Sequence, residues 1–158
     1  MADIAVHQAL NIIHSANYQM SLNVKPDWIT GDFEKDIKNA NLLKLQSGVL
    51  VSIDQDGYIR LAKPTDNFVK VLILSAPGAF WDNMPTFGSY KLSVTGSNSV
   101  IETPQVEDTN IKPGDLLYAS KTTEGLFTKT KDATSVKPVA IALTANSTTD
   151  KNVVVELI

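Results

Sequence analysis

From Leu42 onward the chain is divided into short runs rich in Val, Ile, Leu, Thr and Tyr, each closed by glycine, proline, asparagine or aspartate. Branched and aromatic side chains fit the pleated surface of a sheet, and the closing residues fit tight turns. The runs predict about nine strands. They are residues 49–53, 58–62, 69–76, 90–95, 99–106, 116–120, 126–130, 136–144 and 152–158. We therefore expect a mainly β fold.

Two stretches of this region carry the same elements in the same order. Residues 47–51 align with 113–117, residues 56–59 with 124–127, and residues 69–73 with 137–141. The hairpin is two residues longer in the second stretch, a difference that a loop absorbs at little cost. A turn, a hairpin and a return strand also recur in unrelated β-meanders, so a chance likeness stays open. A true repeat predicts two related β-meander units, 45–76 and 111–145, that form a sandwich or barrel-like domain over residues 42–158.

Residues 1–41 precede the β region and predict an N-terminal helix followed by a linker arm. Asp3 is a helix-capping residue type, and the apolar residues after it recur with helical spacing. They are Val6, Ala9, Leu10, Ile13, Ala16 and Met20. This spacing predicts an α-helix over residues 4–17. Beyond it, Asp32 is placed to cap a short helical turn that carries Phe33.

The composition excludes several classes of site and partner. The chain has no cysteine, so disulfides, thiolate metal sites and cysteine nucleophiles are excluded. Arg60 is the single arginine among 14 basic residues, and 17 acidic residues bring the net charge to −3. We do not expect nucleic acid as a partner. The sequence has no apolar run near the ~20 residues that cross a bilayer and no signal-peptide pattern, so we expect no membrane partner.

Several motifs that carry chemistry in other proteins are incomplete here. Residues 54–57 begin like a calcium loop but lack its late acidic ligand, and their Asp-Gly pair fits a hairpin turn. His7 and His14 share a face of the predicted helix, yet two imidazoles without a third ligand make a poor metal site. The acids at 107–108 stand in a polar linker, and neither a Gly-x-Ser-x-Gly elbow nor a glycine-rich phosphate loop occurs. We assign no catalytic residue, no metal site and no cofactor.

One loop-like segment, residues 76–89, carries large apolar side chains among turn residues. Packing onto the domain's own core is the usual fate of such side chains, and a partner surface is the alternative. Aromatic anchors would dominate binding at that surface. The candidate partner-binding residues are Phe80, Trp81, Met84, Phe87 and, from the N-terminal region, Trp28.

The C-terminal part has a distinctive order of motifs. Ile-Lys-Pro-Gly-Asp-Leu-Leu-Tyr at 111–118 is followed by a hairpin through Gly125, by Lys-Pro-Val-Ala-Ile-Ala-Leu at 137–143, and by a Val-rich end at 152–158. This pattern resembles the capsid decoration, or cement, proteins of tailed bacteriophages. The resemblance covers 111–158 well and 45–76 more loosely, and residues 1–41 lie outside it. It implies a β-rich module, assembled in the host cytoplasm, that coats the phage head and stabilises it by contacts, without an active site.

The function that we expect is therefore that of a viral structural protein bound to the outer surface of a phage capsid. Its expected partners are the lattice of the major capsid protein and further copies of itself. A trimer is favoured over a dimer because the predicted helix leaves apolar surface uncovered and capsids offer threefold positions. A monomer results if the helix packs on its own domain.

Two further functions stay open. In the first, the protein belongs to a phage tail, neck or fibre, where an aromatic loop binds a sugar or a neighbouring subunit. The stacking candidates are Trp28, Trp81 and Tyr90. In the second, the protein is a small hydrolase with a dispersed site, which the absence of converging acid and base groups argues against.

Overall fold

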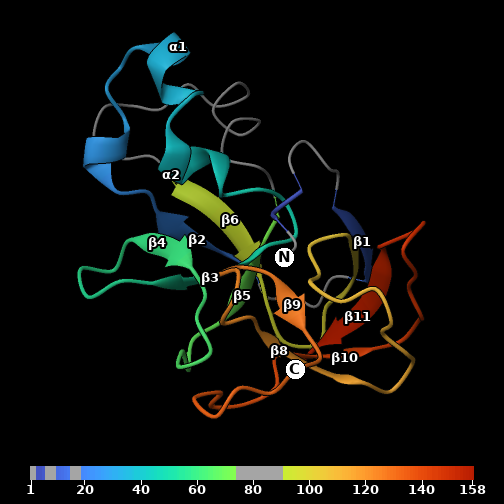
Figure 1. The fold of residues 1–158 in the computed structure, drawn as a ribbon. Coiled ribbons are helices and arrows are strands. Elements are labelled where there is room, and N and C mark those ends of the chain that lie inside the picture. The colour runs from blue at the N-terminus through green and yellow to red at the C-terminus, as the bar shows by residue number, and fades with distance from the viewer. Residues whose placement is uncertain (1–2, 6–9, 15–18, 74–90) are drawn as a thin grey trace.

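The computed structural model describes residues 3–5, 10–14, 19–73 and 91–158, and these form two antiparallel sheets (Figure 1). The six-stranded sheet, sheet A, has the order β1 (Asn11–His14), β7 (Val100–Thr103), β11 (Val153–Leu157), β10 (Ala140–Ala142), β8 (Leu116–Ala119) and β9 (Phe127–Thr128). The five-stranded sheet, sheet B, has the order β2 (Gln19–Asn23), β6 (Lys91–Thr95), β5 (Lys70–Leu72), β3 (Leu50–Ile53) and β4 (Ile59–Leu61). The predicted mainly β class is confirmed, and each run predicted from residue 49 onward contains a strand.

The predicted helix over residues 4–17 is wrong where the structure describes it. Asn11–His14 is strand β1, and it pairs with the edge of β7 through Asn11–Glu102 and Ile12–Ile101. An uncovered strand edge offers unpaired N–H and C=O groups, and the branched side chain of Ile12 packs partly into the core in the extended conformation. Residues 6–9 and 15–18 lie outside the described part. Sheet pairing has thus prevailed over the helical spacing.

Both sheets also extend across the boundary that was predicted between residues 41 and 42. Strand β1 belongs to sheet A, and β2 pairs with β6 of sheet B along its whole length. Between β2 and β3 the chain forms three short helical turns. They are the 3-10 turn η1 (Pro26–Trp28), α1 (Phe33–Asp36) and α2 (Ala40–Leu43). The N-terminal region therefore supplies sheet strands, and residues 24–46 after β2 form what we call the covering segment.

Side-chain caps hold the covering segment in place. The Oδ1 atom of Asp32 accepts hydrogen bonds from the backbone N–H groups of Glu34 and Lys35 at 3.1 and 3.4 Å, which confirms the predicted cap. The Oδ1 atom of Asn39 accepts from the N–H of Leu42 at 3.2 Å and begins α2. A further carboxylate, buried Asp36, accepts three hydrogen bonds from the loop at 30–31. The caps of Asp32 and Asn39 satisfy free N–H groups at the starts of α1 and α2, and Asp36 satisfies those of the loop before α1.

Sheet B is the middle of three layers. Its strands send alternate side chains to opposite faces, as the period of a strand requires. On one face Val51 packs with Leu42 and Leu45 of the covering segment. On the other face Leu50 enters the inter-sheet core, the cluster shared by the two sheets, to which Phe127 also belongs. The covering segment and sheet A therefore enclose sheet B from both sides (Figure 1).

The two sheets share one strand order when β1 is set aside. The order is β2-β6-β5-β3-β4 in sheet B and β7-β11-β10-β8-β9 in sheet A, so each element of sheet B has a counterpart five strands later. Backbone hydrogen bonds match as well. The N–H of Gly48 donates to the carbonyl of Leu72 at 2.8 Å, and the N–H of Gly114 donates to the carbonyl of Ala142 at 2.8 Å. Gly48 thus corresponds to Gly114, and Leu72 to Ala142.

Candidate partner-binding surface

Four of the five predicted partner-binding residues lie outside the described part of the chain, within residues 74–90. They are Phe80, Trp81, Met84 and Phe87, and their role stays a prediction; Tyr90 lies outside as well. The fifth, Trp28, ends η1 and is half-buried against the cluster between sheet B and the covering segment. Its ring also borders a hollow of about 170 Å³ lined by Arg60 and Glu124. The structure therefore places Trp28 on the side of sheet B that faces away from sheet A.

Arg60 beside this hollow is held by an ion pair with Asp66. Its Nη1 and Nη2 atoms donate to the two carboxylate oxygens at 2.8 and 2.6 Å, and the N–H of Lys63 donates to the same carboxylate at 2.7 Å. Burial raises the pKa of the Asp66 carboxyl, but these hydrogen bonds and the charge of Arg60 outweigh burial and lower that pKa. The pair therefore fixes the loop after β4 as a structural element.

Asp66→Asn is expected to lower the free energy of unfolding by about 1–3 kcal/mol near neutral pH, because one carboxylate supplies all three contacts. The folded-state pKa of Asp66 is depressed, so this stabilisation is present above the pKa of an unfolded aspartate, about 3.9. It is lost as the pH falls through the lower, folded-state pKa. Urea denaturation of both proteins across the acid range measures the difference. Glu34→Gln, which removes an exposed carboxylate on α1, is the control, and a difference that persists at the lowest pH would contradict the prediction.

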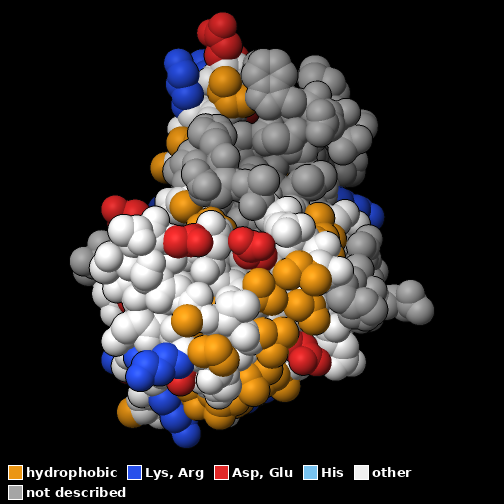
Figure 2. Space-filling view, turned by 90° about the vertical axis from the view of Figure 1, so that its right-hand side faces the viewer, with side chains coloured by type: hydrophobic (Ala, Val, Ile, Leu, Met, Phe, Trp, Pro, Cys, Tyr) orange, Lys and Arg blue, Asp and Glu red, His pale blue; other side chains and the backbone are white. Residues whose placement is uncertain are grey.

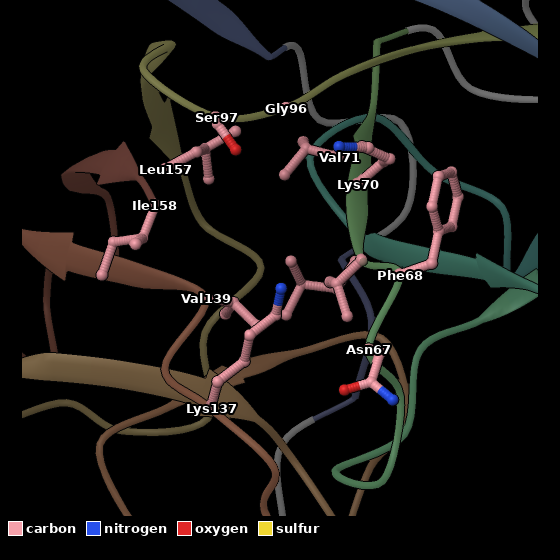
Figure 3. A pocket seen from close by; sticks show the side chains of 12 residues that line it. Asn67, Phe68, Lys70, Val71, Gly96, Ser97, Lys137, Val139, Leu157 and Ile158 are labelled. Carbon is pink, nitrogen blue, oxygen red and sulfur yellow. The ribbon is translucent and has the colours of Figure 1, made fainter.

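A small hollow opens beside β5 and the C-terminal residues (Figure 3). Lys137 and Asn67 lie on one side of it, and Gly96 and Ser97 on the other. Burial, and secondarily the charge of Lys137, lower the pKa of Lys70, which also borders the hollow. Its volume is about 70 Å³, roughly that of two water molecules. This hollow has room for a small anionic group and not for a sugar or a nucleotide.

A wider cleft of about 680 Å³ lies between α2 and the hairpin loop that joins β8 to β9. Its charged side chains include Lys121 and Glu124, and each takes part in an ion pair, with Asp132 and Lys63 respectively. The rest of its lining is mixed, with four aliphatic residues beside Asp3, Lys44 and two threonines.

The outer face of sheet A, the face turned away from sheet B, is unusually apolar. Antiparallel sheets with one face toward water normally carry polar side chains there. Here Ile13, Leu116 and Leu143 are 53%, 45% and 42% exposed. Ile141 and Val154 are half-buried at the outward positions of β10 and β11. Figure 2 shows hydrophobic side chains gathered into a band on the side of the molecule where β1, β10 and β11 lie.

Two glutamates accompany these apolar side chains. Register places Glu102 beside Val154, and Glu156 beside Ile141. Glu102 also accepts a long hydrogen bond of 3.4 Å from the Nδ2 atom of Asn11 on β1. Among the described residues, the outward positions of β1, β7, β8, β10 and β11 carry no Lys or Arg. The face is therefore apolar and acidic, which suits a protein partner better than a small-molecule substrate.

The sequence gives little warning of this surface. Residues 139–143 and 153–155 are continuous apolar runs, and such runs normally indicate strands that are buried on both faces. The apolar residues on both faces of these strands were the one signal in the sequence for an apolar outer face of sheet A. A sequence cannot say whether both faces of such a strand are covered within the same chain.

Within the described ranges, His, Asp and Glu side chains nowhere form a group of three that could hold a metal ion. Among the same residues, the helices fall short of the length and apolar character that a membrane span requires. No protein-family model and no curated protein matches the chain.

Proposed function

We propose that the protein is a structural, non-catalytic component of a virion that binds the outer surface of a tailed-phage capsid and stabilises it. The observation that supports this proposal best is the exposed apolar outer face of sheet A. Large exposed apolar patches on soluble proteins mark interaction sites, since leaving such surface in water is costly. The face of a six-stranded sheet suits a broad protein surface such as a capsid shell.

The resemblance to decoration proteins supports the same surface. Residues 111–118 lead into and form most of β8, residues 137–143 contain β10, and residues 152–158 contain β11. These three strands supply Leu116, Ile141 and Val154 to the outer face of sheet A. The motifs that carry the resemblance thus lie where the proposed binding surface lies.

We also propose that the two sheets arose as a repeat of one five-strand unit. The shared strand order and the matching bonds of Gly48 and Gly114 support it. The pairing of Leu72 with Ala142 moves the third repeated element by two residues from the alignment of 69–73 with 137–141. In this proposal the two units form a sandwich that β1 extends at one edge.

The proposal is tested by mixing the purified protein with undecorated heads, assembled from the major capsid protein encoded in the same genome. We expect the protein to sediment with the heads and to raise the temperature at which they disassemble, because each bound copy stabilises the assembled state. Heads mixed with an unrelated β protein of similar size are the control. Absence of binding to heads at micromolar protein would contradict the proposed function.

A tail, neck or fibre component is the second candidate function. The hollow beside Trp28 favours it, because an indole ring with Arg60 and Glu124 nearby combines the stacking and polar groups that sugars use. Binding to a glycan array that Trp28→Ala abolishes, together with no binding to heads, would favour this candidate.

The homo-oligomer, with a trimer favoured, stays a prediction, but the structure removes the reason first given for it. That reason was an uncovered apolar stripe on a helix over residues 4–17, and Asn11–His14 is a strand. The mass in solution, measured by light scattering, distinguishes a trimer from a monomer.

A further inference from the structure

We infer that the outer face of sheet A binds a different protein, which presents a flat apolar surface carrying lysine or arginine side chains. The contact that we infer is a stacked layer, placed on sheet A as sheet A is placed on sheet B. This inference rests on the proposed function and goes further, because it names the binding surface and the chemistry of the capsid surface that would occupy it.

The correspondence between the two sheets shows which face of sheet A lacks a covering layer. Because Gly48 corresponds to Gly114 and Leu72 to Ala142, Leu50 corresponds to Leu116 and Val71 to Ile141. The register agrees, since Leu50 pairs with Val71 and Leu116 pairs with Ile141. Leu50 and Val71 are buried under sheet A, whereas Leu116 is 45% exposed. The same face of the unit is thus covered by a sheet in one copy, whereas in the other it is open at Leu116 and partly open at Ile141.

The residues on the opposite face of each sheet correspond in the same way. Val51 of β3 and Leu117 of β8 are corresponding residues on the other face of each unit. Leu117 packs into the inter-sheet core, and Val51 packs under the covering segment. The two sheets therefore face the same way, like stacked layers, and do not mirror one another. A further layer in the same orientation would therefore be placed on the outer face of sheet A.

A second copy of the chain does not fit this position. To continue the stack, it would have to offer the face of sheet B that bears Val51, and Leu42 and Leu45 of its own covering segment occupy that face. Two copies placed face to face would instead bring Glu102 and Glu156 of each chain into one contact. No Lys or Arg stands at the outward strand positions described above to offset this repulsion, and buried like charges are costly.

A partner with basic side chains removes this cost. A lysine or arginine opposite each glutamate would pair with it as water leaves the contact, while apolar side chains cover Leu116, Ile141 and Leu143. Opposite charges also accelerate association and make it sensitive to salt. The inference therefore predicts both a loss of binding when the face is altered and a specific change in salt dependence.

The test measures binding to the undecorated heads by co-sedimentation over a range of protein and salt concentrations. Ile141→Lys is expected to weaken binding about 30-fold or more, since it puts a charge at the centre of the contact. The double variant Glu102→Gln, Glu156→Gln is expected to weaken binding about tenfold and to flatten its salt dependence. The matched control is Glu34→Gln with Asp56→Asn, which removes two exposed carboxylates from α1 and from the turn between β3 and β4 and is expected to bind like the wild type.

The possible results distinguish this inference from the proposed function. Wild-type binding that neither set of face variants changes, with folding verified by circular dichroism, would overturn the inference and leave the proposed function standing. Failure of the wild type to bind heads would overturn the proposed function and this inference with it. A dimer in solution that Ile141→Lys converts to a monomer would show that a second copy occupies the face, and would overturn the inference.

Discussion

Replacing Phe127 by alanine is expected to lower the free energy of unfolding by about 3–5 kcal/mol, a large share of the total stability of a domain of this size. Among the described residues, Phe127 is the largest fully buried side chain, and it lies in the inter-sheet core. Its backbone also joins neighbouring segments, donating to the carbonyl of Gln105 and accepting from the N–H of Glu107. Removing the ring leaves a cavity where the two sheets meet, and rigid strands on both sides prevent its collapse.

Urea denaturation followed by circular dichroism measures this loss. Ile158→Ala is the control, since that side chain is 55% exposed and its removal is expected to change stability by less than about 0.5 kcal/mol. A loss below about 1.5 kcal/mol for Phe127→Ala would show that the core repacks, and that the two sheets are not held rigidly against each other.

Gly48→Ala is expected to destabilise the protein by about 2–4 kcal/mol, whereas Gly114→Ala, at the corresponding position, is expected to cost about 1–2 kcal/mol. Both glycines have a positive φ, 86° and 92°, so both substitutions place alanine in the strained left-handed conformation. At Gly48 a Cβ atom would also stand 2.5 Å from the Oγ1 atom of Thr103, whereas at Gly114 it would meet nothing within 4 Å. The clash would displace Thr103, whose Oγ1 accepts a hydrogen bond from the N–H of buried Gln105.

The positive φ is common to both positions. The difference in unfolding free energy between the two alanine variants therefore measures the clash with Thr103 alone. Denaturation midpoints at equal m-value give this difference directly. Equal losses for the two variants would show that the loop beside Thr103 yields to the added methyl group.

The sequence predicted the strands after residue 42 well because their signals are local. Turn residues close each run, and the runs are too short for helices of ordinary length. The run at 49–53, for example, became β3 (Leu50–Ile53), and the run at 152–158 became β11 (Val153–Leu157). Asp32 is likewise a local signal, since a cap needs only its own side chain and the next N–H groups.

The N-terminal error has the opposite cause. Leu10 and Ile13 fit a helical period, but Ile12 also fits a strand, and the choice depended on the free edge of β7, about ninety residues away in the chain. The candidate site depended on such distant partners even more. Nothing near Leu116 or Ile141 reveals that sheet A lies outermost, because only the stacking of complete sheets decides which face remains open.

The strand order has a consequence for a chain that emerges from the ribosome from its N-terminus. In each sheet the strand made last is inserted between earlier ones: β6 lies between β2 and β5, and β11 lies between β7 and β10. Sheet B has all its strands once residue 95 has been made, but sheet A stays divided until residues 153–157 arrive. The outer face of sheet A therefore forms only after residues 153–157 have been made. A nascent or interrupted polypeptide that lacks residues 153–157 would present no such surface.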